Sequence, residues 1–219
     1  MNVLPERLRW IDERTRGEHR FLTVADHCLY FGEFCARGGW SAGATNQLIV
    51  DYKRTPLEIA ASVRARALRF YKERAVRDIA IRLRRAFSTA AVEGLITFVP
   101  IPSSKRVGAP DHCDRLLRTL RLAFGGLAAD IRPLLRQSES TPADHRAAGR
   151  LSLRALLALT EIDATQLARP LRPLVVLFDD VLTSGKHVAV AKTRILEQVS
   201  EQPIIAVLVA RRVREEPAA

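Results

Sequence analysis

The sequence is poor in cysteine, and its cysteines are not spaced for a metal site. Only three occur in 219 residues, Cys28, Cys35 and Cys113, and no Cys-x-x-Cys pair is present. An odd number without close pairs argues against both a disulfide framework and a zinc ribbon. We therefore expect three free thiols, buried in the protein interior.

Long apolar stretches are also missing. No segment approaches the roughly 20 apolar residues that a membrane-spanning helix requires, and residues 1–7 lack the apolar core of a secretory signal peptide. We therefore expect a cytoplasmic protein without membrane contact. The hydrophobic fraction of 47% and the charged fraction of 27% are typical of a globular chain. A chain of this length can form one α/β domain with a full core.

Acidic residues are outnumbered, with 24 Asp and Glu against 35 Lys and Arg, for a net charge of +11. This excess favours polyanionic ligands such as nucleotides, pyrophosphate or nucleic acid. Many of the arginines are spread over helical segments between residues 64 and 85 instead of forming a low-complexity tail. Such a distribution is more typical of a solvated helix surface, so nucleic-acid binding stays an alternative.

The most informative segment is 174–186, where an apolar run ends in Asp179 and Asp180 and a polar turn follows. The apolar run predicts a strand that is buried on both faces within a parallel sheet. The turn predicts the entry to a helix that extends through Leu196. Ligands of open α/β sheets bind at the carboxyl ends of such strands.

The side chains of this turn suit a sugar phosphate. Thr183, Ser184, Gly185 and Lys186 offer backbone N–H groups, two hydroxyls and an ammonium at a helix N-terminus, where phosphate binds well. The two carboxylates before the turn can accept hydrogen bonds from sugar hydroxyls or lie near a phosphate-bound Mg²⁺.

Segment 174–187 is open to two other interpretations. A Walker B strand also ends in acids, but a P-loop at the chain's only Gly-Lys pair would need glycine at position 180 and a hydroxyl residue at 187, where Asp180 and His187 stand. That interpretation is rejected. An ordinary buried strand with a polar turn is the other alternative, although two adjacent carboxylates at a strand end are costly unless they bind something.

Segment 174–187 resembles the phosphoribosyl pyrophosphate (PRPP) motif of type I phosphoribosyltransferases. Residues that match the motif in register are Asp179, Asp180, Thr183, Ser184 and Gly185. The resemblance implies that the acids hold the ribose hydroxyls as catalytic residues and that the loop from Thr183 through Lys186 and His187 binds the 5′-phosphate. His187 departs from the motif, which usually has Thr there; imidazole can also donate, but it is bulkier and changes charge near neutrality.

The amino-terminal segment 1–47 differs in composition from the rest. Residues 21–24 and 28–34 predict two short strands around 25–27, and a glycine-containing loop follows at 38–43. We expect an antiparallel hairpin beside or over the sheet. By resemblance, this segment would be the hood that covers the acceptor substrate in phosphoribosyltransferases.

The rest of the chain alternates predicted strands and helices. Residues 55–58 (Thr-Pro-Leu-Glu) predict a helix start with a capping box, and that helix runs to about Phe87, unbroken or with one break. Asp111 is expected to cap a helix through Leu127. Other predicted elements are strands at 96–101, 131–135 and 204–209 and a helix at 151–159. This alternation predicts a doubly wound, mostly parallel α/β sheet over residues 48–219.

The order of these features over roughly residues 48–210 looks like the ComF-like phosphoribosyltransferases. The features are Tyr52-Lys53-Arg54, then Val99-Pro100-Ile101-Pro102, a leucine-rich helix, a polar loop and the two-acid motif; the family's amino-terminal zinc ribbon is absent. By position, Ser103, Ser104 and Lys105 match the pyrophosphate-binding loop. Segment 136–150 matches the flexible loop that closes over the site.

The resemblance implies an enzyme that binds PRPP with Mg²⁺, transfers the phosphoribosyl group to an acceptor and releases pyrophosphate. Two alternatives remain: a non-catalytic module that senses PRPP or a nucleotide and acts on nucleic acid or a protein partner, and the same fold with another sugar phosphate as ligand. The sequence does not identify the acceptor. A homodimer is common among similar proteins.

Overall fold

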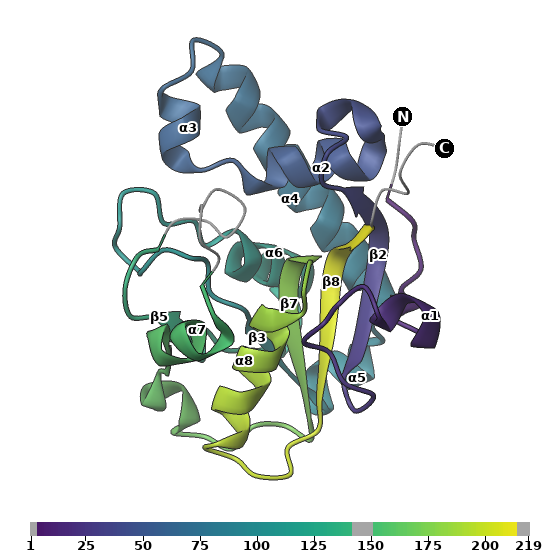
Figure 1. Cartoon of the computed structure of the whole chain (residues 1–219). Helices are drawn as coiled ribbons and strands as arrows, with labels where there is room; N and C mark the ends of the chain where they lie inside the picture. Colours follow the sequence, from purple (N-terminus) through teal and green to yellow (C-terminus); the bar gives the residue numbers. More distant parts are fainter. Residues whose placement is uncertain (1–3, 142–150, 214–219) are drawn as a thin grey trace.

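The computed structural model describes residues 4–141 and 151–213, and their main sheet has six strands (Figure 1). The strand order is β1-β2-β8-β7-β3-β4, and all neighbours are parallel except β1 and β2. The strands are β1 (Arg9–Trp10), β2 (His27–Cys35), β3 (Ile96–Pro100), β4 (Asp130–Ile131), β7 (Leu174–Leu182) and β8 (Ile204–Val213). A mixed α/β fold with a mostly parallel sheet is therefore confirmed.

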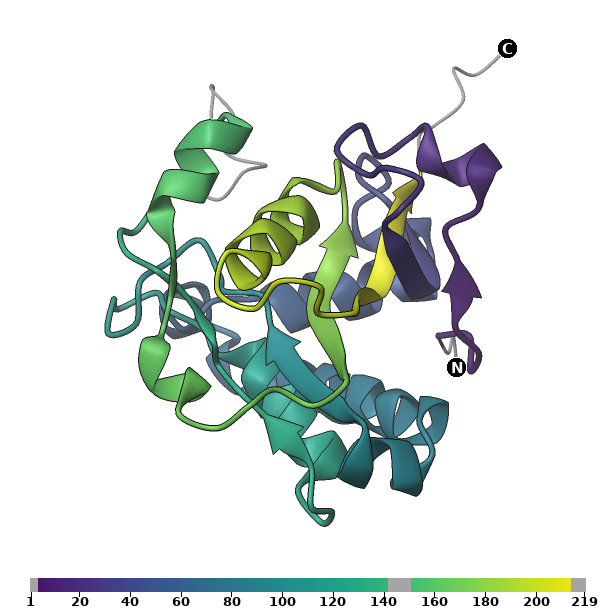
Figure 2. The ribbon, with the colours of Figure 1, turned by 90° about the horizontal axis from the view of Figure 1, so that it is seen from below.

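Helices cover both faces of this sheet, as the view in Figure 2 shows. One face carries α2 (Ala44–Lys53), α4 (Ala65–Ala86), α5 (Thr89–Gly94) and α6 (Arg115–Phe124), and the other carries α8 (Lys186–Leu196). Beside α8 lie α7 (Leu153–Leu159) and a small antiparallel sheet of β5 (Leu135–Gln137) and β6 (Thr160–Ile162). Short elements are α1 (Glu13–Arg16), η1 (Trp40–Ala42), α3 (Pro56–Ala60) and η2 (Ala164–Leu167).

Strand β7 divides the core in two because successive side chains of a strand point to opposite faces. Val176 and Phe178 belong to the cluster beneath α4 and α6, while Val175 and Leu177 belong to the cluster beneath α8. All four are at most 1% exposed. The apolar run in the sequence therefore forms a strand buried on both faces, as predicted.

The chain changes direction in the sheet at β3. After β3, helix α6 leads to β4 on one side of β3, and the chain later returns to β7 on the other side. Such a reversal of strand order separates the connections that leave the carboxyl ends of the two strands and opens a crevice there. The loops that follow β3 and β7 both begin at this edge of the sheet.

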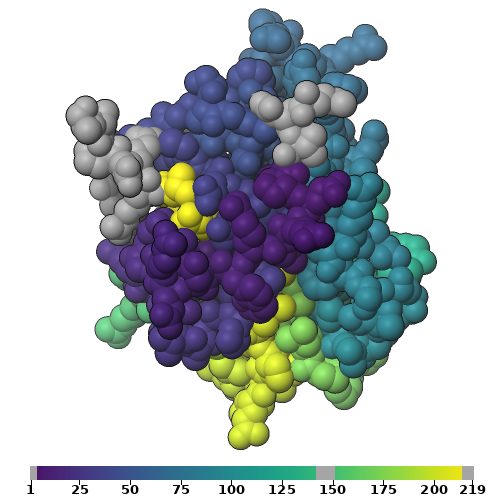
Figure 3. Space-filling model, turned by 90° about the vertical axis from the view of Figure 1, so that its right-hand side faces the viewer, coloured from purple at the N-terminus to yellow at the C-terminus, as the bar shows by residue number. Residues whose placement is uncertain are grey.

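The predicted amino-terminal hairpin is wrong. Residues 21–24 form no strand, and 28–34 lie within β2, which pairs in parallel with β8 inside the main sheet. Cys28, Tyr30 and Phe31 are at most 4% exposed, so this run is apolar because both faces of β2 are covered. Figure 3 shows the purple amino-terminal segment packed against the body of the molecule on that side.

Two boundaries also differ from the prediction. Asp111 caps no helix: α6 begins at Arg115, and the Asp111 carboxylate pairs with Lys105 at 2.9 Å. The strand expected at 131–135 is divided between β4 and β5, which belong to different sheets. The capping box at Thr55 is confirmed, and of the two alternatives for the helical stretch the structure has the one with a break, because α3 ends at Ala60 and α4 begins at Ala65.

All three cysteines are free, as predicted. Burial is complete only for Cys28, where it raises the pKa of the thiol to about 12. Within residues 4–141 and 151–213, no helix combines the length and the apolar character needed to cross a lipid bilayer.

Candidate functional site

The turn between β7 and α8 depends on Gly185. This residue has a left-handed backbone with φ of 80°, and α8 begins directly after it. A Cβ atom at this position would lie 2.7 Å from the Cδ2 atom of Leu22. Only glycine combines this backbone conformation with such a close approach at little cost, so the glycine of the predicted motif is also required by the fold.

The amino-terminal segment holds this turn from outside. Nδ1 of His19 lies 2.5 Å from the carbonyl oxygen of Thr183, which can only accept, and the Phe21 amide donates to the Ser184 carbonyl at 3.0 Å. The carbonyl oxygens of Thr183 and Ser184 therefore both have partners, whereas the Thr183 side chain is exposed and Ser184 is half-buried. Nothing in the sequence indicates this contact between segments more than 160 residues apart.

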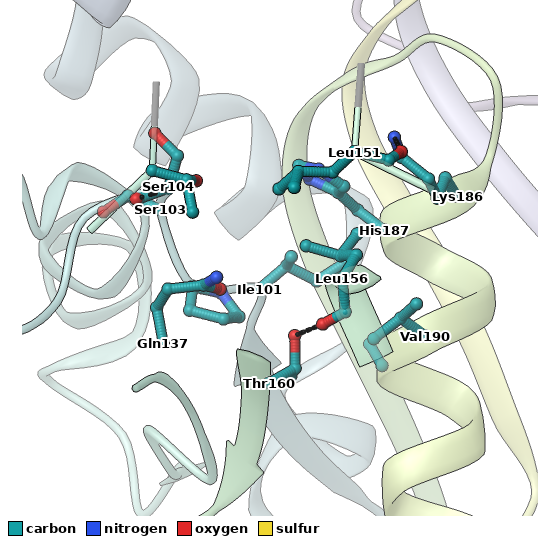
Figure 4. Close-up of a pocket in the computed structure, with 13 residues that line it drawn as sticks. Ile101, Ser103, Ser104, Gln137, Leu151, Leu156, Thr160, Lys186, His187 and Val190 are labelled. Carbon is teal, nitrogen blue, oxygen red and sulfur yellow. Dashed lines mark hydrogen bonds between the residues drawn. The ribbon is translucent and has the colours of Figure 1, made fainter. Parts of the chain in front are cut away.

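A pocket lies where the loop after β3 meets the start of α8 (Figure 4). The empty space at this place is about 490 Å³, a volume that includes open solvent at its mouth. Four of the predicted binding residues line it: Ser103, Ser104, Lys186 and His187. The pocket thus lies beside the reversal in strand order, at the edge of the sheet where ligands of α/β proteins bind.

The polar residues of the pocket are tied to neighbouring loops. Lys186 is 3% exposed, and its ammonium donates to the Leu151 carbonyl at 2.5 Å, which links α8 to the segment before α7. The Ser104 carbonyl accepts from the Thr141 amide at 2.8 Å. The Ser103 hydroxyl donates to the Lys105 carbonyl at 3.2 Å. These bonds position two hydroxyls and an ammonium around one space.

Lys105 is not brought into the pocket. Its ammonium forms the ion pair with Asp111 described above, and the residue is absent from the pocket wall. The expected loop around 102–105 therefore contributes its two serines to the pocket but not its cation. Of the segment 136–150, which is expected to close over the site, residues 142–150 lie outside the described residues.

The two adjacent acids do not line the pocket either, and they make different contacts. Asp180 accepts from Nζ of Lys53 at 3.1 Å and from Nε of Arg115 at 3.2 Å, with a second, closer bond from Nη2 of Arg115. Asp179 accepts from the Asp180 amide at 2.7 Å and lies 3.9 Å from Nδ1 of His187. The side chain of His187 thus lies between Asp179 and the pocket. The carboxylate of Asp180 instead accepts hydrogen bonds from Lys53 on α2 and Arg115 on α6.

These surroundings move the pKa values of the two acids in opposite directions. Burial, together with the negative charge of Asp180, raises the pKa of Asp179 from 3.8 to about 7. Burial alone would also raise the pKa of Asp180, but the charges and hydrogen bonds of Lys53 and Arg115 lower it well below its ordinary value of 3.8. At neutral pH, the negative charge of these two adjacent acids therefore lies mainly on Asp180.

Sequence reasoning did not find the partners of Asp180. Lys53 enters the resemblance only as part of the tripeptide Tyr52-Lys53-Arg54, and Arg115 is one of many arginines on helical segments. Their proximity to Asp180 follows only from the packing of α2 and α6 on the same face of β7.

The pocket does not fit a protein-bound Mg²⁺. Its wall contains hydroxyl, amide, ammonium and imidazole groups but no carboxylate, whereas Mg²⁺ is usually held through carboxylates. Within the described part of the chain, no cluster of three His, Cys, Asp or Glu side chains could hold a metal. The donor set instead suits phosphate oxygens, so Mg²⁺ would have to be carried by a diphosphate ligand.

No protein-family model and no curated protein matches this chain.

Proposed function

We propose that this protein binds PRPP with its Mg²⁺ and transfers the phosphoribosyl group to an acceptor, with release of pyrophosphate. The observation that carries this proposal is the convergence of Ser103 and Ser104 with Lys186 and His187 on one pocket beside the reversal of strand order. Helix α8 has 11 residues, so the amides of its first turn and the positive end of its dipole favour an anion at this place.

In this proposal the 5′-phosphate lies against the turn from Thr183 to Lys186, and the two serines donate to the pyrophosphate. The acceptor's lone pair forms a bond to C1′ while the bond from C1′ to the pyrophosphate oxygen breaks. Pyrophosphate leaves with the electron pair, and the acceptor's proton passes to solvent. Because C1′ develops positive charge, the protein acts through positioning and charge stabilisation.

The resemblance assigns the ribose hydroxyls to Asp179 and Asp180, and the geometry favours the first of them. Asp180 already accepts hydrogen bonds from Lys53 and Arg115, whereas Asp179 lies on the side of His187, which borders the pocket. Asp179 is therefore the better placed of the two to meet a hydroxyl of a bound sugar. In this proposal Asp180 acts mainly by positioning the two cations.

A pair of serine substitutions tests the pyrophosphate contact. Each hydroxyl would make a hydrogen bond to a charged oxygen, and such bonds contribute about 1.5–3 kcal/mol each. We expect the variant Ser103→Ala/Ser104→Ala to bind pyrophosphate, with Mg²⁺ present, at least about tenfold more weakly than the wild type by calorimetry.

Lys105→Ala is the matched control because Lys105 adjoins the serines in sequence but pairs with Asp111 instead of lining the pocket. Its effect on pyrophosphate affinity should be much smaller. Equal weakening in the two variants, or no weakening in the serine variant, would contradict the assignment. Release of pyrophosphate from PRPP in the presence of candidate acceptors then distinguishes an enzyme from a module that only binds PRPP.

One surface favours the alternative of a PRPP- or nucleotide-sensing module that acts on nucleic acid. Exposed arginines at positions 64, 66, 69 and 77 on and before α4 make no ion pair within the described ranges. Phe70 and Tyr71 lie among them, with ring centroids 5.7 Å apart, and are 63% and 40% exposed. Exposed aromatics among arginines suit single-stranded nucleic acid, since bases stack on rings and phosphates pair with guanidinium groups.

Salt dependence tests this second function. If α4 binds a single-stranded oligonucleotide, affinity measured by fluorescence anisotropy should fall steeply with salt. The triple variant Arg66→Gln/Arg69→Gln/Arg77→Gln should then show a shallower salt dependence and weaker binding, while Arg121→Gln on α6 serves as a control. Binding that is undetectable at low salt, or identical in all three proteins, would contradict nucleic-acid binding by this surface.

A further inference from the structure

A lysine lies on the buried face of α4. Lys72 precedes Ile79 and Leu83 at helical spacing, and like them it is buried, with 8% exposure. A buried ammonium is costly unless an opposite charge neutralises it. The acid next to Lys72 in sequence, Glu73, pairs with Arg118 instead. Among the residues that the structure describes, no carboxylate forms an ion pair with Lys72.

The contacts of this ammonium lead to a cysteine on the loop before α6. Nζ of Lys72 donates to the carbonyl oxygen of Tyr52 at 3.3 Å and, at closer range, to that of Arg54. Its third contact is Sγ of Cys113, at 3.2 Å. A lysine ammonium has three hydrogens, so these contacts can use all of them. Of the three partners only the thiol can ionise, and a thiolate at Cys113 would supply the charge that Lys72 otherwise lacks.

Two features make this pair reactive toward an oxidant. Cys113 is only partly buried, so a small molecule can reach its sulfur from solvent. Burial lowers the pKa of Lys72, although the adjacent Cys113 acts in the opposite direction. The amine therefore loses its proton more readily than that of an exposed lysine. The thiolate and the neutral amine are the nucleophilic forms of the two groups.

We propose that Cys113 and Lys72 form a peroxide-reactive site whose oxidised state is a covalent sulfur–nitrogen bond. First, the Cys113 thiolate attacks hydrogen peroxide: an S–O bond forms, the O–O bond breaks, and hydroxide leaves with the electron pair and takes up a proton. The product is a sulfenic acid. The Lys72 amine then attacks this sulfur: an S–N bond forms, the S–O bond breaks, and hydroxide leaves with the amine's proton as water. Sulfur is oxidised by two electrons, and one peroxide is reduced to two waters.

This site adjoins the groups that surround Asp180. Lys72 holds the carbonyls on either side of Lys53, and Cys113 lies two residues before Arg115. Lys53 and Arg115 are the two cations that donate to Asp180. A sulfenamide nitrogen keeps a single hydrogen, so oxidation releases at least one of the two carbonyls. The redox state is thereby linked to the surroundings of Asp180, and the inference goes beyond the proposed function without depending on it.

Peptide mass spectrometry of the full-length protein tests the inference. After treatment with hydrogen peroxide at neutral pH and digestion with trypsin, we expect the peptides that contain Lys72 and Cys113 to be joined. Their joint mass should lie about 2 Da below the sum, without cleavage after Lys72, and dithiothreitol should restore both peptides. The two residues are 41 positions apart in sequence. The same treatment in urea should therefore give at least about tenfold less of the linked product.

Three variants complete the test. Cys113→Ser should give no linked product, whereas Cys35→Ser should give as much as the wild type. Cys35 is also only partly buried, so it controls for exposure alone. Lys72→Arg keeps the positive charge but removes the nucleophilic amine, so Cys113 should stop at the sulfenic acid, which dimedone traps. The comparison of folded and urea-treated wild type decides the question even if Lys72→Arg does not fold.

Other products at Cys113 would overturn the proposal. These are a sulfinic acid with Lys72 unmodified and a disulfide to another cysteine. An equal yield of the linked product in urea, or a Cys113 that stays reduced while Cys35 is oxidised, would do the same. Because none of these measurements involves PRPP or pyrophosphate, their failure is distinct from a failure of the proposed function.

Discussion

Replacing Asp180 with asparagine is expected to lower the free energy of unfolding by about 3–5 kcal/mol. The carboxylate side chain is 6% exposed and faces Arg115, whose side chain is 12% exposed. Asparagine has nearly the same shape, but it leaves the Arg115 guanidinium buried without its counter-charge. Urea denaturation at pH 7, with unchanged slope, measures the loss directly.

A double variant separates the lost charge from other effects. Arg115→Gln in the Asp180→Asn background removes the cation that the first substitution leaves uncompensated. The double variant should therefore be more stable than the sum of the two single effects predicts, by about 1–3 kcal/mol. Additive effects, or a loss below about 1 kcal/mol in Asp180→Asn, would mean that the ion pair is not important for stability.

Asp179→Asn should have the opposite effect, and that effect should depend on pH. The pKa of Asp179 is raised from 3.8 to about 7 in the folded protein. The folded state therefore holds this proton more tightly than the unfolded state, and the resulting stability is present below about pH 4 and is lost as pH rises to about 7. Asparagine is neutral throughout and escapes this loss.

We expect Asp179→Asn to exceed the wild type in unfolding free energy by on the order of 2–4 kcal/mol at pH 8, with little difference at pH 4. Denaturation curves of both proteins at four or five pH values measure this difference. Asp180 provides the contrast, because its pKa is lowered and its contribution to stability is lost as pH falls. A difference between Asp179→Asn and wild type that does not change with pH would contradict the raised pKa.

The opposite pKa shifts of Asp179 and Asp180 also bear on the proposed chemistry. An acid that titrates near neutrality beside His187 can change its protonation when a sugar phosphate binds, whereas an acid committed to two cations cannot do so readily. The adjacent residues that look equivalent in the motif would therefore have different functions. The alternation of side chains along β7 gives them these different surroundings.

Local patterns in the sequence were sufficient for several elements. The apolar run of β7 predicted a strand buried on both faces, and the capping box at Thr55 predicted the start of α3. The turn with Gly185 predicted the entry to α8. Each of these depends on residues only a few positions apart, because hydrophobic periodicity, capping and turn conformation are local properties of the chain.

Tertiary structure decided what the local patterns could not. The apolar run of β2 is compatible with an outer hairpin or a central parallel strand, and only its pairing with β8 selects the second. Asp180 meets Arg115, 65 residues away, and Gln137 reaches a pocket formed mostly by other segments. Such contacts depend on the order of strands in the sheet and on which helices share a face, and these follow from the packing of the whole chain. The sequence by itself therefore determined which segments could form strands, helices and an anion-binding turn, whereas the packed fold decided which side chains surround the pocket and which neutralise one another.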